Sequence, residues 1–321
     1  MRREGSPWQG LGTVLLKELA DHFDSARMLL LALLMVLAAA VPLYGAIEQL
    51  RTTTSEDAFL LLKLFNPGGQ TLSVVAILGF VIPVMAIGLG FDAINGEHNR
   101  RTLSRILAQP IYRDALLAGK FLAAVTVLAV NLTSLWLLVV GLGVLQLGVP
   151  PSGDEFARSL VFLIIAIAYA GAWLGLAMLF SVLFRSPATA ALLALGVWLF
   201  MTLLWPMISP FIAQLIAPPD IRYQLLGILD PQTAVWQQAL SRISPYLLFE
   251  EAARTILTPT TPSLGPLLDQ IRQLRGEVVG AALPLRESLL IAWPQAVGLI
   301  AGAIVLFVAT YVAFQRQEVR A

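Results

Sequence analysis

The chain has 321 residues, of which 58% are hydrophobic and only 13% are charged. A soluble domain usually has about 25% charged residues, so this composition places the chain in the membrane class. The formal net charge is +1, which gives no electrostatic reason to expect a nucleic-acid partner. Cysteine is absent, and this excludes disulfides and thiolate metal sites.

The N-terminal segment, residues 1–27, predicts an amphipathic helix lying at a membrane surface. Its apolar residues recur at helical spacing, and they are Trp8, Leu11, Leu15, Leu19 and Phe23. Arg2 and Arg3 resemble the start of a secretory signal. However, 24 residues separate Arg3 from the first long apolar run, so we expect a retained helix.

Six apolar stretches are long enough to cross a bilayer, because a spanning helix needs roughly 20 apolar residues. They are residues 28–47, 71–91, 121–149, 159–184, 188–217 and 288–314. The predicted fold class is therefore an all-α polytopic membrane protein with six transmembrane helices. We expect the fifth stretch to leave the membrane near Pro206 or Pro210, and Asn131 in the third to form an interhelical hydrogen bond.

Basic residues predict the orientation, because cytoplasmic loops of membrane proteins carry an excess of Lys and Arg. With both termini in the cytoplasm, the three basic residues of the short outside loops are Arg51, Lys63 and Arg158. The twelve on the inside are Arg2, Arg3, Lys17, Arg27, Arg100, Arg101, Arg105, Arg113, Lys120, Arg185, Arg316 and Arg320. The sequence therefore predicts a multi-pass protein of the plasma membrane with both termini in the cytoplasm.

None of the six apolar stretches contains Asp, Glu, Lys, Arg or His. Carriers driven by protons or ions usually keep an ionisable residue at membrane depth. Intramembrane metalloenzymes need histidines and carboxylates there, whereas His22 and His98 both lie outside the stretches. We therefore predict no catalytic residues, no metal site and no cofactor bound by this chain.

Gly119 and Lys120 do not form a nucleotide site. A phosphate-binding loop needs a Gly five residues before such a pair and Ser or Thr directly after it, and these positions hold Asp114 and Phe121. The energy for any uphill transport is therefore expected to come from a separate chain.

The cytoplasmic loop 92–120 is the densest polar block of the chain, and residues 95–109 predict a helix within it. Its apolar stripe consists of Leu103, Ile106 and Leu107, and its polar series consists of Glu97, Arg101 and Arg105. Pro110 is expected to end the helix. Such a helix can dock into a groove of a partner protein. The simpler alternative is a positive loop that sets the topology and contacts anionic lipid.

The segment 218–287 is the only sizeable region outside the apolar stretches on the opposite side. Ser244 and Pro245 predict a helix start, and Thr258 and Pro259 predict its end. The residues expected on one face of this helix are Leu248, Ala252, Thr255 and Ile256. We predict two or three helices that rest on the outer leaflet or cap an exit, with a structural lid and a substrate-selecting role both open.

The cytoplasmic block resembles the corresponding loop of ABC-2-type permeases, the membrane subunits of ABC transporters. The matching residues are Glu97, Thr102, Leu103, Gln109, Pro110, Arg113, Gly119 and Lys120. Residues 184–200 and 244–259 resemble the inner turn with the fifth span and the segment before the last span of that family. The chain departs from the pattern at Arg101, where the family often has glycine, and this implies a looser or more electrostatic contact.

The resemblance implies the permease subunit of an ATP-driven ABC transporter, and most of the family exports. A helix at 94–113 would be the coupling helix, seated in a groove of a separate cytoplasmic ABC ATPase that uses ATP-Mg. The path would lie between this chain and a second copy or a homologous permease. The residues expected to couple to the ATPase are Glu97, Arg100, Arg101, Thr102, Leu103, Arg105, Ile106, Leu107, Gln109, Pro110 and Arg113.

The expected partners are the ATPase, the second permease and membrane lipid, with no nucleic acid. The predicted organisation of the chain has five parts. The parts are a cytoplasmic segment 1–27 with an interfacial elbow helix, spans one to five at 28–217 including the coupling loop 92–120, an extracytoplasmic helical loop 218–287, the sixth span 288–314 and a cytoplasmic tail 315–321. The resemblance implies that the elbow helix frames the docking surface, and a simple anchor is the alternative.

Two other functions remain alternatives to a transport subunit. One is a membrane scaffold or assembly protein without transport activity of its own. The other is an intramembrane enzyme, which the absence of a catalytic pair in or beside the spans disfavours.

Overall fold

The computed structural model describes residues 10–51, 59–67, 73–99, 112–148, 150–225, 228–259 and 282–316. Within these ranges every regular element is a helix. Six helical stretches are long and apolar enough to cross a membrane, and they are Ala26–Arg51, Val74–Asn99, Arg113–Leu147, Gly153–Leu183, Pro187–Ile216 and Leu285–Arg316. The predicted fold class, an all-α polytopic membrane protein with six spanning helices, is confirmed.

The helices that contribute to these stretches are α2 (Ala26–Arg51), α4 (Val74–Gly90), α5 (Asn95–Asn99), α7 (Arg113–Leu147), α8 (Gly153–Leu183), α9 (Pro187–Leu199), the π-helix η1 (Phe200–Leu204), α10 (Trp205–Ile216) and α15 (Leu285–Arg316). The remaining helices are α1 (Leu11–Phe23), α3 (Leu60–Phe65), α11 (Ile221–Leu225), α12 (Pro231–Ser241) and α13 (Pro245–Leu257).

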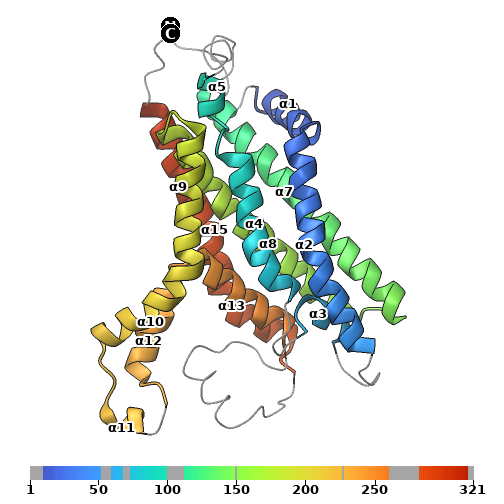
Figure 1. Ribbon diagram of the computed structural model, residues 1–321, viewed down its shortest axis with the longest axis vertical. Coiled ribbons are helices and arrows are strands. Elements are labelled where there is room, and N and C mark those ends of the chain that lie inside the picture. Colours follow the sequence, from blue (N-terminus) through green and yellow to red (C-terminus); the bar gives the residue numbers. More distant parts are fainter. Residues whose placement is uncertain are drawn as a thin grey trace.

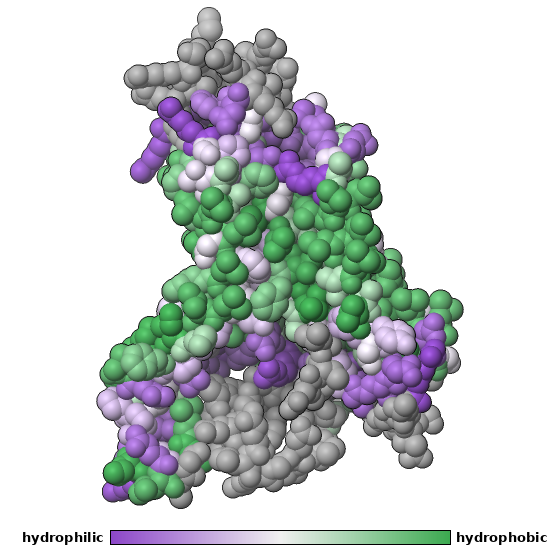
Figure 2. Space-filling view, viewed as in Figure 1, coloured by the Kyte–Doolittle hydropathy of each residue, from purple (hydrophilic) through white to green (hydrophobic). Residues whose placement is uncertain are grey.

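The bundle has two ends, which we name by a helix at each (Figure 1). The α5 end contains α1, α5, the start of α7 and the end of α15. The α13 end contains α3, α13 and the starts of α8 and α15, and α10 to α12 extend away from it. Figure 2 shows polar side chains gathered at both ends, with a largely apolar band between them. This distribution is the one expected for a protein whose middle is surrounded by lipid.

Helix α8 is the centre of the bundle, because α4, α7, α13 and α15 all pack against it. Its side chains Tyr169 and Trp173 are fully buried. Small residues allow the close approach of its neighbours: a Cβ built on Gly175 would lie 3.0 Å from Leu306 of α15, and one on Gly90 would lie 2.9 Å from Ala177. Glycine at such contacts is typical of helix packing in membranes.

Helix α13 begins and ends as the sequence predicts. The Ser244 hydroxyl accepts a hydrogen bond from the Leu247 amide, Pro245 occupies the first turn, and the helix ends at Leu257. All four residues of the predicted face are buried, and they are Leu248, Ala252, Thr255 and Ile256. The helix does not merely rest on the bundle, because it packs against α4, α8 and α15, and the Phe249 ring stacks on Tyr169 at 4.6 Å.

The fifth span matches its predicted stretch, and the helix continues through Pro206 and Pro210 to Ile216. The predicted exit from the membrane near these prolines stays a prediction. The π-helix η1 ends two residues before Pro206, whose ring and missing N–H disturb the α-helical hydrogen bonds one turn earlier. The Met201 carbonyl in η1 accepts a hydrogen bond of 2.7 Å from the Ser244 hydroxyl. Only 11% of the apolar 18-residue stretch within this span is buried inside the protein, so most of its surface faces outward.

The predicted interhelical hydrogen bond of Asn131 is wrong for its amide nitrogen. That nitrogen donates to the Val127 carbonyl of the same helix, at 2.8 Å. A polar side chain in an apolar helix can satisfy its donor on the preceding turn, and no partner helix is then needed for it.

Arg158 lies inside α8 at the α13 end, and its side chain is completely buried. Its guanidinium binds the Asp154 carboxylate at 2.6 Å and donates to three groups far along the chain. These are the Ile256 carbonyl at 3.2 Å, the Ser288 hydroxyl at 3.0 Å and the Leu283 carbonyl at 2.5 Å. We call these five residues the Arg158 cluster. It fastens the end of α13 and the start of α15 to α8.

Candidate functional site

The α5 end holds the described part of the predicted coupling loop. Helix α5 is anchored to the end of α8, where the Ser181 hydroxyl accepts hydrogen bonds from the Ile94 and Asn95 amides at 3.0 and 3.3 Å. The Asn95 side chain donates to the Phe184 carbonyl at 3.1 Å. These bonds join the start of the loop to the turn between α8 and α9.

Three helices meet at one buried ammonium group. The Lys120 amine in α7 binds a carboxylate oxygen of Glu18 in α1 at 2.9 Å and one of Glu97 in α5 at 2.6 Å. The exposed fractions of these side chains are only 6% for Lys120, 11% for Glu18 and 14% for Glu97. We call these three residues the Lys120 cluster. Breaking a buried ion pair by removing one partner is strongly destabilising, so the cluster holds its three helices together.

The residue before Lys120 brings α1 close to α7. A Cβ built on Gly119 would lie 2.7 Å from Cγ1 of Val14 and 2.9 Å from its Cβ, which is closer than real Cβ atoms come. Val14 and Glu18 are the buried residues of α1 and lie four positions apart, on one face of the helix. Gly119 and Lys120 therefore form the seat of α1, one by its lack of a side chain and the other by its charge.

Burial and nearby charges have opposite effects on the pKa of Glu18. Burial alone would raise this pKa, but Lys120 and Lys17 together lower it below its ordinary value. Lys17 of α1 binds Glu18 at 3.0 Å and Asp21 at 2.8 Å. The carboxylate of Glu18 is therefore held in its charged form by two ammonium groups.

His22 lies one turn after Glu18 on α1. Burial lowers the pKa of His22, and Glu18 opposes this effect, whereas Lys120 and Arg27 add to it. The imidazole is therefore favoured in its neutral form beside the cluster.

A second ion pair links the first two spans at the same end. The Arg27 guanidinium at the start of α2 binds Asp92 through two hydrogen bonds of 2.9 and 2.8 Å. It also donates to the Gly88 carbonyl at 2.9 Å, and its cation lies 5.3 Å from the centre of the Phe91 ring. The bidentate geometry fixes the turn between α4 and α5 against the start of α2.

Of the residues expected to couple to the ATPase, the structure describes Glu97 and Arg113. The Arg113 cation lies 6.0 Å from the centre of the Phe314 ring at the end of α15. Glu97 and Arg113 therefore both lie at the α5 end, against different helices. The other predicted residues lie outside the described part of the chain, and they are Arg100, Arg101, Thr102, Leu103, Arg105, Ile106, Leu107, Gln109 and Pro110.

Sequence reasoning missed Glu18, Asp92 and Ser181 as partners of this region. The signal for Lys120 was present, because it is a lone cation beside a long apolar run. Its partners come from α1 and α5, and nothing in a single sequence pairs residues so far apart.

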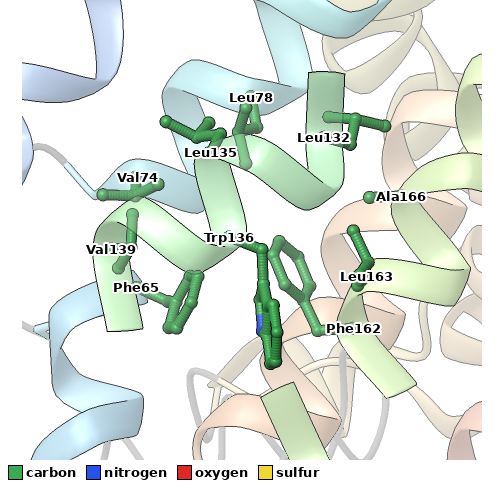
Figure 3. A pocket seen from close by; sticks show the side chains of 10 residues that line it. All are labelled: Phe65, Val74, Leu78, Leu132, Leu135, Trp136, Val139, Phe162, Leu163 and Ala166. Carbon is green, nitrogen blue, oxygen red and sulfur yellow. The ribbon is translucent and has the colours of Figure 1, made fainter. Parts of the chain in front are cut away.

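Two hollows among the described helices are lined by hydrophobic side chains. A cavity of about 10 Å³ lies between α3, α4, α7 and α8, and all ten of its lining side chains are hydrophobic (Figure 3). Its size is about that needed for a single water molecule. A larger hollow of about 250 Å³ lies between α7, α8 and α15 and is lined only by apolar residues, among them Phe121, Gly171 and Phe307. Among the described residues, no group of three His, Asp or Glu side chains is placed to hold a metal ion.

Comparison with known proteins gives this architecture a family. A sequence model described as "ABC-2 family transporter protein" matches residues 13–319, which is nearly the whole chain. The chain belongs to the ABC-2 family of transporter proteins. The six spanning helices and the polar α5 end fit the membrane subunit of such a transporter.

Two relatives in this family have the same description, "Probable ABC transporter permease protein NosY". The one from Pseudomonas aeruginosa is 26% identical over 289 residues, which cover 86% of this chain and 96% of the relative. The one from Stutzerimonas stutzeri is 28% identical over 200 residues, which cover 60% of this chain and 66% of the relative. This ABC-2 protein is accordingly a multi-pass permease subunit of an ABC transporter, a class that works with a partner ATPase subunit.

Proposed function

We propose that this ABC-2 permease couples to a separate cytoplasmic ATPase through residues 94–113 and forms an export path together with a second permease. In this arrangement both termini and the α5 end face the cytoplasm. The observation that supports this proposal most directly is the attachment of α5. Hydrogen bonds and ion pairs fix the start of the proposed coupling segment to three helices of the bundle, α1, α7 and α8.

The anchoring supports coupling because a force on the segment can reach several spans. The amides of Ile94 and Asn95 bind α8 through Ser181, and the carboxylate of Glu97 binds α7 and α1 through Lys120. A segment that only sets topology has no need of such a fixed attachment. ATP-driven closure of the ATPase would therefore displace packed helices.

The packing of the bundle supports a path between two permeases. The cavity between α3, α4, α7 and α8 holds about 10 Å³, about the size of one water molecule, and the hollow of about 250 Å³ between α7, α8 and α15 has no polar lining. In the span α9–α10 only 11% of the apolar 18-residue stretch is buried, and in α15 only 17%. Large apolar surfaces of these two spans are therefore free to contact lipid and a second copy or a homologous permease.

The proposed orientation rests on the excess of basic residues in the loops assigned to the cytoplasm. The proposed export direction rests on the resemblance, because most members of the family export. In this orientation the α13 end and the arm of α10 to α12 lie outside the cell. ATP-Mg binds only to the partner, and this chain contributes no catalytic residue.

The test is capture of the ATPase by purified permease. Replacing Arg101→Glu and Arg105→Glu together should weaken the capture about tenfold or more, because reversal of two interface charges costs about 1.4 kcal/mol or more. Glu97 is unsuitable for this test, since a cation there would face Lys120. The matched control replaces the exposed Arg222 and Arg286 by Glu at the α13 end and should leave the capture unchanged.

Capture at the unchanged yield by the Arg101→Glu, Arg105→Glu protein would show that this segment is not the coupling site. Failure of the unaltered permease to bind any ATPase encoded beside it would favour the alternative, a membrane scaffold without transport activity.

A further inference from the structure

We propose that Lys120 is a positioning residue that carries movement of the coupling segment to α1. In this view α1 is a moving part of the energy transfer and more than a membrane anchor. The inference rests on the proposed function, because it assumes that an ATPase displaces the segment that begins with α5.

The first step of the argument is that one ammonium group joins two helices of like charge. Glu18 of α1 and Glu97 of α5 bind the same Lys120 amine, at 2.9 and 2.6 Å. Without that amine the two carboxylates would repel each other in a site that is largely shielded from water. Lys120 is therefore the group through which α1 and α5 attract each other.

The second step separates two routes out of α5. Its backbone start is bound by the Ser181 hydroxyl and leads to α8, whereas its Glu97 carboxylate is bound by Lys120 and leads to α7 and α1. Loss of the Lys120 cluster leaves the route to α8 in place. The two routes can consequently be tested independently, and of these two only the second contacts α1 directly. The Arg27–Asp92 pair, which leads to α2, is left intact in this test.

The third step concerns how closely α1 follows α7. Val14 packs on Gly119 with no room for a Cβ, and Glu18 binds the next residue of α7. Lys17 holds Glu18 and Asp21 from within α1, which orients the carboxylate toward Lys120. Because α1 contacts two adjacent residues of α7, the two helices are expected to move together.

The fourth step leads from α1 to the first span. Ser25 lies in the turn after α1, and its hydroxyl donates to the His22 carbonyl and accepts from the Met28 amide, at 2.8 and 3.2 Å. The chain direction thus changes at a hydrogen-bonded turn. A tilt of α1 is passed directly to α2.

The test measures whether α1 responds when the partner binds nucleotide. The chain contains no cysteine, so Ala20→Cys on the exposed face of α1 provides one site for a nitroxide label. The labelled permease is assembled with its ATPase in lipid nanodiscs. The electron paramagnetic resonance spectrum of the label is then compared with and without a non-hydrolysable ATP analogue.

The decisive variant, which we call the neutral variant, is Glu18→Gln. It removes the ion pair between α1 and α7 and leaves the Lys120–Glu97 pair in place, so no buried charge of the cluster loses its last partner. Glu18 lies outside the proposed coupling segment, so this variant should still capture the ATPase, and its label should lose the response to nucleotide. Lys120→Arg should keep the response, because a guanidinium can bind two carboxylates. The control Glu250→Gln with Arg254→Met removes an exposed pair at the α13 end and should respond normally.

Each other outcome overturns the inference or the function beneath it. A normal response in the neutral variant shows that α1 moves without Lys120. No response in the unaltered labelled complex shows that α1 does not move. Loss of ATPase capture in the neutral variant alone shows that the cluster shapes the docking surface and does not transmit movement. If the unaltered permease captures no ATPase, the proposed function fails first.

Discussion

Among the residues that the structure describes, each end of the bundle holds one buried cation, and the two cations are bound in different ways. Arg158 is fully buried and donates mainly to carbonyl and hydroxyl groups, and its one carboxylate partner is on its own helix. Lys120 binds only carboxylates in its cluster, and these come from two other helices. The planar guanidinium fixes several partners at set angles, whereas the ammonium is a point charge on a flexible stem. The comparison indicates a rigid α13 end and an α5 end whose helices can turn while they remain bound.

The largest expected effect comes from breaking the Arg158 cluster. Arg158→Met would leave the Ile256 and Leu283 carbonyls without their donor and the Asp154 carboxylate without its cation. We expect the free energy of unfolding to fall by about 3–5 kcal/mol, because several polar groups packed around the buried guanidinium lose their donor at about 1–3 kcal/mol each. Thermal unfolding in detergent measures this loss. An Arg254→Met protein, which loses only an exposed pair, serves as the control, and equal stability of the two variants would contradict the rigid role of Arg158.

A smaller effect is expected at the seat of α1. Gly119→Ala would place a methyl group within 3 Å of Val14, so α1 must shift, at a cost of about 1–3 kcal/mol. Val14→Ala should restore much of the stability in the Gly119→Ala background. A double-mutant cycle on thermal unfolding gives the coupling between the two positions. Simple additivity of the two changes would show that the contact does not seat α1.

The smallest effect is a pH dependence confined to the α5 end. Burial lowers the pKa of His22 in the folded protein, so the unfolded chain binds more protons between that value and about 6.5. The stability of the docked α1 should therefore fall as the pH drops below about 6.5. Glu18, Lys120, Arg27 and Asp92 are the charges that surround this imidazole.

Hydrogen exchange of the α1 amides between pH 7 and pH 5.5 measures this change. His22→Gln should flatten the profile, because glutamine does not titrate in this range. An equal change at the amides of α13 would assign the effect to the whole bundle.

The spans and the start of α13 could be predicted because their signals are local. Apolar length decides a span, and the pair Ser244–Pro245 specifies a helix start without reference to the rest of the chain. The π-helix η1 inside the fifth span could not be predicted, since apolar length shows where a helix runs and not how its hydrogen bonds are arranged. The predicted division of the chain into parts and the coupling residues between Arg100 and Pro110 stay predictions.

The sequence could predict that charged residues gather at the candidate site, but it could not predict which of them pair. Glu97 was singled out for its spacing to Arg101, yet its carboxylate binds Lys120 of the next long helix. Gly119 was noted as half of a false phosphate-loop pattern, whereas its role depends on Val14, which lies far away in the sequence. Such pairings arise from the packing of α1 on α7, and no periodicity within either segment reveals them.

The Arg158 cluster also constrains the order in which the protein can be completed at the ribosome. Helix α8 is synthesised long before residues 256, 283 and 288, so its guanidinium first lacks the three hydrogen-bond acceptors that these residues supply. The cluster closes when the last hydrophobic segment has been inserted. A nascent chain that stops short of α15 therefore carries a guanidinium with unused donors, which distinguishes unfinished protein from finished protein.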